Sequence, residues 1–309
     1  MQSQCSPHHH HIVHRLIIMV VATVTFSVSL SRVLAEDHPL GAAGAFDVFV
    51  FSNHNANNTD VTGRVAVGGH AQYANLGIGS ALSNSDGQRN DLIVQGNLLW
   101  NNGQNFNGNS QVGGSKTCLG VNHPNGSVGT TPDIDFNLAQ QHCELMAVYW
   151  AGLPPTGTVT KQWGQIMFQG QDEQLNVFTM PAADFSGCYG LTISVPEGST
   201  VLVNLSGPSS VMMFFQIFLD GADPSKLLFN FSSTTSIMLN GIGWKGTILA
   251  PHANIQFNNG HIDGAMIAYT VQGNGETHHV PFKDDLPTEE EEEEEEDTPQ
   301  IPFAVGAFD

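Results

Sequence analysis

One phrase occurs twice near the end of the chain. Gly-Thr-Ile-Leu-Ala at 246–250 returns as Gly-Ala-Met-Ile-Ala at 264–268, eighteen residues later. A helix repeats its apolar face every three to four residues, and a strand alternates every two. Three faces of about six residues would instead make one rung of eighteen, which is the geometry of a β-solenoid. The repeat therefore constrains the fold more than any other feature.

Stacked rungs place equivalent side chains in ladders, and the apolar ladders fill the interior. We therefore expect Ile248, Leu249 and Ala250 to lie beneath Met266, Ile267 and Ala268. The polar residues between the two phrases are interpreted as corner or outward-facing residues without partners: His252, Asn254, His261 and Asp263.

Short β-type phrases separated by Gly and Asn extend from Leu40 to Leu286. Three related phrases, RVAVGG, LIVQGN and SQVGGS, begin near residues 64, 92 and 110, about one or one and a half rungs apart. Strands this short and this often bounded by Gly suggest a sandwich, a barrel or a solenoid. The recurrences favour the solenoid, so we predict a mainly β fold, a right-handed parallel β-helix.

One segment departs from this pattern. Residues 133–152 have few β-branched residues, and their apolar positions have helical spacing. Asp133 or Asp135 can serve as N-cap, and Gly152 fits the C′ position. We predict one α-helix, packed alongside the solenoid through a stripe of Ile134, Leu138, Leu145, Met146 and Tyr149.

The two ends of the chain differ from its body. An apolar run at 16–30 followed by Val33-Leu34-Ala35 is typical of a cleaved signal peptide, because a membrane span needs roughly 20 residues. This prediction assigns 1–35 to the signal, 36–287 to the solenoid domain and 288–309 to an acidic disordered tail. His8–His11 and Cys5 would leave with the signal. The mature chain would then be extracellular and without a membrane span.

The charge of the chain limits its partners. The formal net charge is −20, with 29 acidic residues against 9 Lys and Arg. Phosphate binding needs clustered cations, so nucleic acid is excluded as a partner. The run Glu289–Glu296 is interpreted as a solvated spacer, with weak cation binding as the alternative.

A secreted chain can form disulfides and, in a glycosylating cell, carry N-glycans. Removal of the signal leaves three cysteines, so we predict one disulfide among Cys118, Cys143 and Cys188 without choosing the pair. Four Asn-x-Ser/Thr sequons are candidate glycosylation sites: Asn57, Asn125, Asn204 and Asn230.

Ordered motifs over residues 39–287 carry a family resemblance. They are LGAAGAFDVFVFSN, NNTDVTGRVAVGG, LIVQGNLLWNNG, DIDF, AGLPPTGTV, STVLVNLSG, GIGWKGTILAPHANIQFNNGHIDGAMIA and THHVPFKDDLP. In these motifs the chain resembles the choice-of-anchor A family of secreted adhesive proteins. That resemblance implies a cleaved signal and an exchangeable C-terminal anchor, but Leu286-Pro287-Thr288 is followed by Glu289 rather than the Gly of a sortase signal. The helix and the segment 246–268 are also similar to β-solenoid ice-binding proteins.

Catalytic motifs were weighed against ordinary turns. Asn58-Thr59-Asp60 resembles a polygalacturonase motif, and Asp284-Asp285 is a carboxylate pair, but the Gly-His-Gly and Arg-x-Lys motifs of that family are missing. We interpret Asp60 as capping an Asx turn and Asp220 and Asp223 as turn residues rather than calcium ligands. His278 and His279 would point to opposite sides of a strand. We assign no catalytic residue, metal ligand or cofactor.

Three functions remain after these exclusions. The first is a secreted, non-enzymatic protein that adheres to a surface, glycan or matrix. The alternatives are ice binding, which expects a regular array of small hydroxyl and methyl groups, and a β-helix carbohydrate-active enzyme. The segments TGTVT at 156–160 and SSTTS at 232–236 contain Thr, but no Thr-x-Thr ladder recurs at constant rung spacing.

Overall fold

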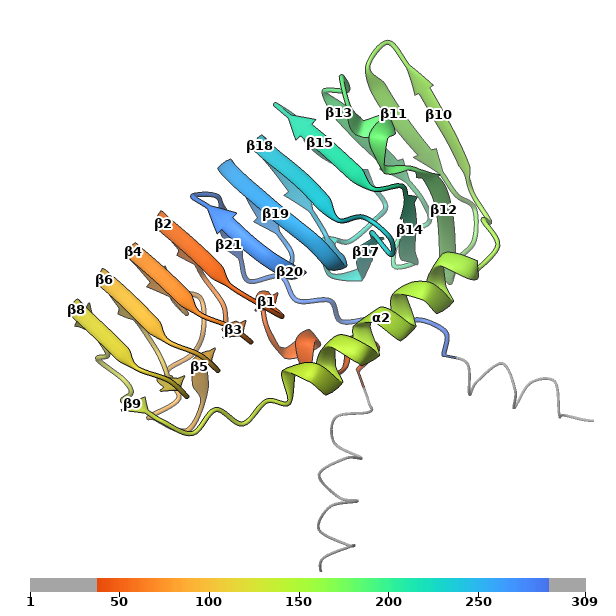
Figure 1. Ribbon diagram of the computed structural model, residues 1–309. Coiled ribbons are helices and arrows are strands. Elements are labelled where there is room, and N and C mark those ends of the chain that lie inside the picture. Colours follow the sequence, from red (N-terminus) through yellow and green to blue (C-terminus); the bar gives the residue numbers. More distant parts are fainter. Residues whose placement is uncertain (1–37, 289–309) are drawn as a thin grey trace, which may run out of the picture.

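The computed structural model describes residues 38–288. The predicted signal peptide, Cys5, His8–His11 and the run Glu289–Glu296 lie outside these residues. Within them the chain is a stack of short strands with one long helix along its side (Figure 1). The prediction of a mainly β fold with one α-helix is confirmed. No helix in residues 38–288 is both long and apolar enough to cross a membrane.

The first arm of the stack begins in its middle and winds toward one end (Figure 1). A short 3-10 helix, η1 (Gly41–Ala45), precedes it. Its strands are β1 (Val48–Val50), β2 (His54–Val61), β3 (Val65–Val67), β4 (Ala71–Ile78), β5 (Asn90–Val94), β6 (Leu98–Asn105), β7 (Asn109–Val112), β8 (Lys116–Asn122) and β9 (Val128–Gly129).

The helix α2 (Phe136–Gly152) then runs along the side of the stack and carries the chain to its far end (Figure 1). The second arm starts there with a hairpin of β10 and β11. This pair is antiparallel, whereas the other pairs of named strands in residues 38–288 are parallel. It winds back until β20 pairs with β1 in parallel, so the two arms meet in the middle. Its elements are β10 (Thr158–Gln162), β11 (Gln165–Gln169), β12 (Leu175–Pro181), η2 (Ala182–Phe185), β13 (Gly190–Ser194), β14 (Thr200–Ser206), β15 (Ser209–Met213), β16 (Gln216–Asp220), η3 (Pro224–Lys226), β17 (Leu227–Asn230), β18 (Ser236–Lys245), β19 (Thr247–Asp263), β20 (Met266–Gly273) and β21 (Glu276–His278).

Each rung contributes to three faces. The helix face lies under α2 and contains β1, β3, β5, β7, β12, β14, β17 and the first parts of β19 and β20. The amide face contains the first parts of β2, β4, β6 and β8, the end of β20, the middle of β19, the start of β18, and β15. The histidine face contains β11, β13, β16, β21 and the ends of β18, β19 and β2.

The predicted eighteen-residue rung is confirmed at the repeated phrase. Ile248, Leu249 and Ala250 pair with Met266, Ile267 and Ala268. Ile248 and Ala250 point into the interior, whereas Leu249 points to the helix. The phrase begins with Gly twice for a steric reason: Gly246 has φ +96°, and a Cβ on Gly264 would collide with the Gly246 carbonyl.

The three related phrases of the first arm also lie in one column. Val65 pairs with Leu92, and Leu92 pairs with Ser110. The wider spacing of the first two comes from a loop inserted between β4 and β5, not from an extra half rung. A loop of this kind leaves the register of the next rung unchanged.

The helix was predicted correctly, but most of its buried stripe was not. Asp135 is the N-cap, and its carboxylate accepts from the N–H groups of Asn137 and Leu138. The side chains that α2 buries are Phe136, Ala139, Cys143, Met146, Ala147 and Trp150. Of the predicted stripe only Met146 is fully buried, while Leu138 and Leu145 are exposed. The helix is rotated so that its largest ring, Trp150, packs against the stack.

Candidate functional site

The middle outward-facing position of the amide face forms one row across both arms. Its members come from eight stacked rungs and are all exposed: Val211, Met238, Gln256, Gln272, Asn55, Gln72, Leu99 and Thr117. Neighbouring strands lie about 4.8 Å apart, so the row presents side chains at a regular interval, and four amides occupy its consecutive central rungs.

A second row borders the first and is fully polar. Its members are Ser209, Ser236, Asn254, Thr270, Asn53, His70, Asn97 and Ser115. In the first arm each side chain accepts from the backbone of the next rung. The Asn53 Oδ1 accepts from the His70 N–H at 2.8 Å, His70 Nδ1 from the Asn97 N–H at 2.9 Å, and Asn97 Oδ1 from the Ser115 N–H at 2.9 Å. These contacts hold the row in one orientation before any ligand binds.

The far border of the amide face in the first arm is an asparagine corner. Asn58, Asn75 and Asn102 have φ values of 50°, 53° and 61°, the left-handed region that Asn tolerates well. The Asn75 Nδ2 donates to Asn58 Oδ1 at 2.7 Å, and Asn102 Nδ2 donates to Asn75 Oδ1 at 2.8 Å. The abundance of Asn in the first half of the sequence is explained by this ladder and by the second row.

A shallow groove of about 710 Å³ lies between the two rows, over β2, β4, β6, β8 and the end of β20. None of its lining residues is Asp, Glu, Lys or Arg, although the chain has a net charge of −20. The groove therefore offers amide, hydroxyl and imidazole groups rather than ionic ones. Such a surface suits a neutral ligand rich in hydrogen-bonding groups.

The floor of the groove is also uncharged. His54 is buried, and its Nδ1 lies 3.0 Å from the Tyr73 hydroxyl. Burial lowers the pKa of His54 to about 4, so the ring is neutral at physiological pH. His54 is thus a packed structural residue beneath the two rows.

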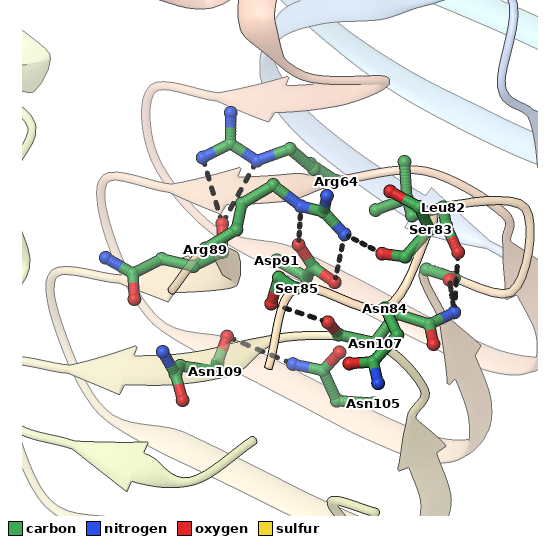
Figure 2. Close-up of polar contacts among 12 residues, drawn as sticks. Arg64, Leu82, Ser83, Asn84, Ser85, Arg89, Asp91, Asn105, Asn107 and Asn109 are labelled. Atoms are coloured by element: carbon green, nitrogen blue, oxygen red, sulfur yellow. Dashed lines mark hydrogen bonds and ion pairs between the residues drawn. The ribbon is translucent and has the colours of Figure 1, made fainter. Parts of the chain in front are cut away.

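The two arginines that follow the predicted signal hold the loop inserted between β4 and β5, as Figure 2 shows. Asp91 is completely buried, and Arg89 Nε donates to its Oδ1 at 2.6 Å. Arg89 Nη2 also donates to the Ser83 carbonyl at 2.9 Å, and Arg64 donates to the Asn90 carbonyl through Nε and Nη2. These arginines are committed to the fold, so they are not available to a uronate substrate.

The carboxylates considered as catalytic groups, Asp60, Asp284 and Asp285, do not line the groove. Asp284 accepts from Lys226 Nζ at 3.0 Å and from the Thr200 hydroxyl. Asp60 lies within β2 rather than capping an Asx turn, so that interpretation was wrong. Burial, together with the nearby Glu276, raises the pKa of Asp60. Asp223 caps η3 by accepting from the Ser225 N–H, which is the turn chemistry predicted for it.

Charged residues gather on the histidine face instead. Asp263 lies between Lys245, whose Nζ is 2.8 Å from Oδ2, and His278, whose Nδ1 is 2.6 Å from Oδ1. Burial opposes ionisation, but hydrogen bonds from Lys245 and His278 bring the pKa of Asp263 below its usual value. His279 contacts a different carboxylate, Asp47, at 2.9 Å. Residues 38–288 contain no group of three or more His, Cys, Asp or Glu that could hold a metal ion.

The four polar residues expected to lack partners all have them, so that expectation was wrong. His252 Nδ1 lies 3.5 Å from Glu144 Oε1, and Asn254 Oδ1 accepts from the Thr270 hydroxyl at 2.6 Å. Asp263 has the two partners described above, and the His261 ring stacks on His278 with centroids 5.2 Å apart. Rung stacking creates the contacts of Asn254, His261 and Asp263, whereas His252 meets Glu144 of α2 because the helix lies against the stack.

The predicted disulfide is absent from the structure, in which Cys118, Cys143 and Cys188 are all free. The solenoid separates them. Cys143 faces Leu40 from the inner side of α2, Cys188 contacts the Asp184 carbonyl, and Cys118 lies on the terminal strand β8. None of the three possible pairs among these cysteines is bonded in the described residues.

The four sequons occupy different environments. Asn204 and Asn230 are buried, and their Nδ2 atoms donate to the Trp150 and Ala147 carbonyls of α2 at 2.6 and 2.8 Å. Asn125 is half-buried and donates to the Phe106 carbonyl at 2.9 Å. Asn57 is exposed at the border of the amide face. The sequence pattern alone could not distinguish an amide that holds the helix from one that faces solvent.

Residues 39–279 match the family described as "Putative Ice-binding-like adhesive domain". No curated protein matches the sequence significantly.

Several solved structures are similar. An ice-binding protein from the Antarctic ascomycete Antarctomyces psychrotrophicus is 17% identical, with a TM-score of 0.43, over 80% of this chain and 98% of that one. The DUF3494 domain of ice-binding protein 1 from Shewanella frigidimarina is 13% identical, with a TM-score of 0.35, over 80% and 97%. An antifreeze ice-binding protein from an Arctic yeast is 14% identical, with a TM-score of 0.35, over 81% and 96%.

Proposed function

We propose, from the premise that this chain belongs to the ice-binding-like adhesive domain family, that it is a non-enzymatic adhesive protein whose amide face binds a neutral, hydroxyl-rich extracellular surface. A polysaccharide is the ligand class that this face suits best. The observation that carries the proposal is the uncharged groove between the middle row and the hydrogen-bonded second row.

The arrangement of polar groups supports a polysaccharide over a protein ligand. Amides carry both donors and acceptors, so Asn55, Gln72 and Gln272 can pair with a hydroxyl in either orientation. The second row is held in place by its own hydrogen bonds, which lowers the entropy cost of binding. A repeating polymer can then make the same contact on several rungs, and weak contacts add through multivalency.

Ice binding is the second candidate, favoured by the family description and by the absence of charge from the groove. The side chains favour it less. The middle row contains Gln72, Gln256 and Gln272, which are long and flexible, and Thr117 is its one Thr. Observation of single ice crystals on a cooling stage separates the two candidates: an ice-binding protein shapes the crystal facets, whereas a glycan-binding protein leaves them unaltered.

We do not propose a carbohydrate-active enzyme. Retaining and inverting glycosidases need two carboxyl groups across one bond, one of them free to act as acid. The groove has no carboxyl group among its lining residues, and Asp284 is held by Lys226 and Thr200.

We further propose that residues 1–35 direct secretion and that the protein acts outside the cell. The winding of the coil is expected to be right-handed, because parallel crossover connections nearly always are. Fractionation of producing cells tests the location: the protein should appear in the medium or on the cell surface, with its N-terminus after Ala35. Retention of the intact N-terminus inside the cell would contradict it.

The binding face is tested with two isosteric charge substitutions, Asn55→Asp and Gln72→Glu. Each keeps the shape of the side chain and places a carboxylate in the uncharged groove. Against a panel of immobilised neutral polysaccharides, we expect the unmodified protein to bind at least one and the double variant to bind it at least tenfold more weakly.

The matched control is Gln216→Glu, an exposed amide of β16 on the histidine face. It adds one carboxylate, as each single groove substitution does, but at a distance from the groove, so its binding should equal that of the unmodified protein. Failure to bind any polysaccharide, or equal binding by all variants, would remove the support for this proposal.

A further inference from the structure

The outward side of α2 carries an apolar stripe that the described residues do not cover. Leu138, Leu145 and Val148 are 52%, 57% and 64% exposed. Their spacing of seven and three residues places them on one side of the helix. The charged residue of α2 is Glu144, which accepts a hydrogen bond from Gln140 and lies beside His252. Glu144 is not one of the stripe residues, so the stripe itself is uncharged.

The chain leaves the described region at the C-terminal end of this helix. Leu286 is buried, the Trp150 Nε1 donates to the Pro287 carbonyl at 2.9 Å, and the Tyr149 hydroxyl donates to the Thr288 carbonyl at 3.3 Å. Whatever follows Thr288 therefore starts within one or two helical turns of Leu145 and Val148.

The remaining sequence has a spacer and an apolar end. Residues 289–297 are all acidic, and after Thr-Pro-Gln the chain reads Ile-Pro-Phe-Ala-Val-Gly-Ala-Phe at 301–308. An extended chain over 289–300 could reach about 40 Å, whereas Leu138 lies about 17 Å along the helix from Tyr149. The whole stripe is therefore within reach of the apolar end.

We propose that the segment Ile301–Phe308 binds the stripe of Leu138, Leu145 and Val148 on α2 of the same chain. The segment offers Ile301, Phe303, Val305 and Phe308 to an uncharged helix side on which Gln141 lies among the three apolar residues. A short tether raises the effective concentration to the millimolar range, so binding within one chain outcompetes binding between chains. This inference does not depend on which ligand the amide face binds.

Photo-crosslinking in the full chain tests the contact. A benzoylphenylalanine in place of Phe303 should crosslink to the peptide that contains Leu138–Val148, with the mass of a single chain and with a yield independent of protein concentration. The double variant Leu145→Gln and Val148→Gln keeps good helix formers at exposed positions. It should reduce that crosslink at least fivefold.

Two controls complete the experiment. Met213→Gln changes an exposed apolar residue of β15, away from α2, and should leave the yield unchanged. The same photo-crosslinker in place of Glu293, within the spacer, should give little reaction with the stripe. Crosslinks that map away from α2, that join two chains, or that persist in the double variant would overturn the proposal.

Discussion

Val48, in the first strand of the stack, pairs with Met266, in its last full rung. Both side chains are buried in the interior, and between them the two arms of the chain meet. The stack is therefore continuous in space although the chain enters it in the middle. The rungs on the two sides of this junction are not consecutive in the chain, so strand pairing, packing and side-chain hydrogen bonds such as that of Thr59 to the Gly275 carbonyl hold them together.

The junction should make both arms unfold together. Met266→Ala removes buried apolar atoms at the junction and should lower the free energy of unfolding by about 2–5 kcal/mol. Hydrogen exchange should then increase in β4 of the first arm as well as in β18 of the second. Tyr269→Ala, at an exposed position of the same strand, is the control. Faster exchange in one arm only would show that the arms are independent.

The repeated phrase predicts two substitutions with opposite outcomes. Leu249→Asp places an unpaired charge between the stack and α2, where no partner is available, and should prevent folding. His261→Ala removes a half-buried ring that stacks on His278 and should change the stability by less than about 1 kcal/mol. Thermal unfolding followed by circular dichroism measures both. A large loss with His261→Ala would contradict the assignment of this residue to the outer surface.

The pair of Arg89 and Asp91 should matter more than an exposed ion pair. Arg89→Met leaves the fully buried Asp91 carboxylate without its main partner, and we expect a loss of about 3–5 kcal/mol. Adding Asp91→Asn should recover part of that loss. Lys161→Met breaks an exposed pair with Asp184 and should cost less than about 1 kcal/mol. Urea unfolding compares the four proteins, and equal losses for Arg89→Met and Lys161→Met would refute the prediction.

His54 should make the protein less stable at mildly acidic pH. Its folded-state pKa of about 4 is below the unfolded value of about 6.5, so only the unfolded chain binds a proton between these values. The free energy of unfolding should fall by about 3 kcal/mol from pH 6.5 to pH 4 and show no further change from this residue below that.

The variant His54→Gln can still bond to the Tyr73 hydroxyl but does not titrate. Urea unfolding at pH 6.5 and 4 should therefore show a smaller difference for the variant. Part of the difference should remain, because burial also lowers the pKa of His38 and His123. An unchanged pH dependence would assign the effect to other groups.

Asn57 is expected to be the main glycan acceptor when the protein is made in a glycosylating cell. Its side chain is exposed, whereas a glycan on Asn204 or Asn230 would have to lie between the stack and α2. Intact-mass measurement should show that Asn57→Gln removes the glycan mass and that Asn204→Gln does not. Glycan remaining on Asn57→Gln would point to Asn125.

The sequence pattern predicted the helix but not its orientation. Asp135 and the Pro residues after Gly152 limit the helix locally, so its bounds could be read from neighbouring residues. Which side is buried depends on the surface that the helix meets. The stack offers the outward rings and aliphatic groups of Phe49, Leu202, Leu228 and Leu249, and α2 turns Trp150 and Cys143 toward them. Leu138 and Leu145 consequently remain outside despite their hydrophobicity.

The candidate site was less predictable than the fold. Asn55 and Gln72 are ordinary polar residues in the sequence, and they become one surface only because rungs seventeen residues apart pair in register. The composition is rich in Asn, a residue that tolerates the positive φ found at Asn58 and Asn75. It gave no indication that Asn53 and Asn97 would form a border row.

The sequence by itself determined the rung: its length, its register at Ile248 and Met266, and the presence of one capped helix. These depend on side-chain patterns within about twenty residues. Only the tertiary structure decided the order of the rungs, because any rung edge offers similar backbone groups to a parallel partner. The pairing of Val48 with Met266 depends on α2 carrying the chain past the first arm before the second begins. No local pattern encodes that path.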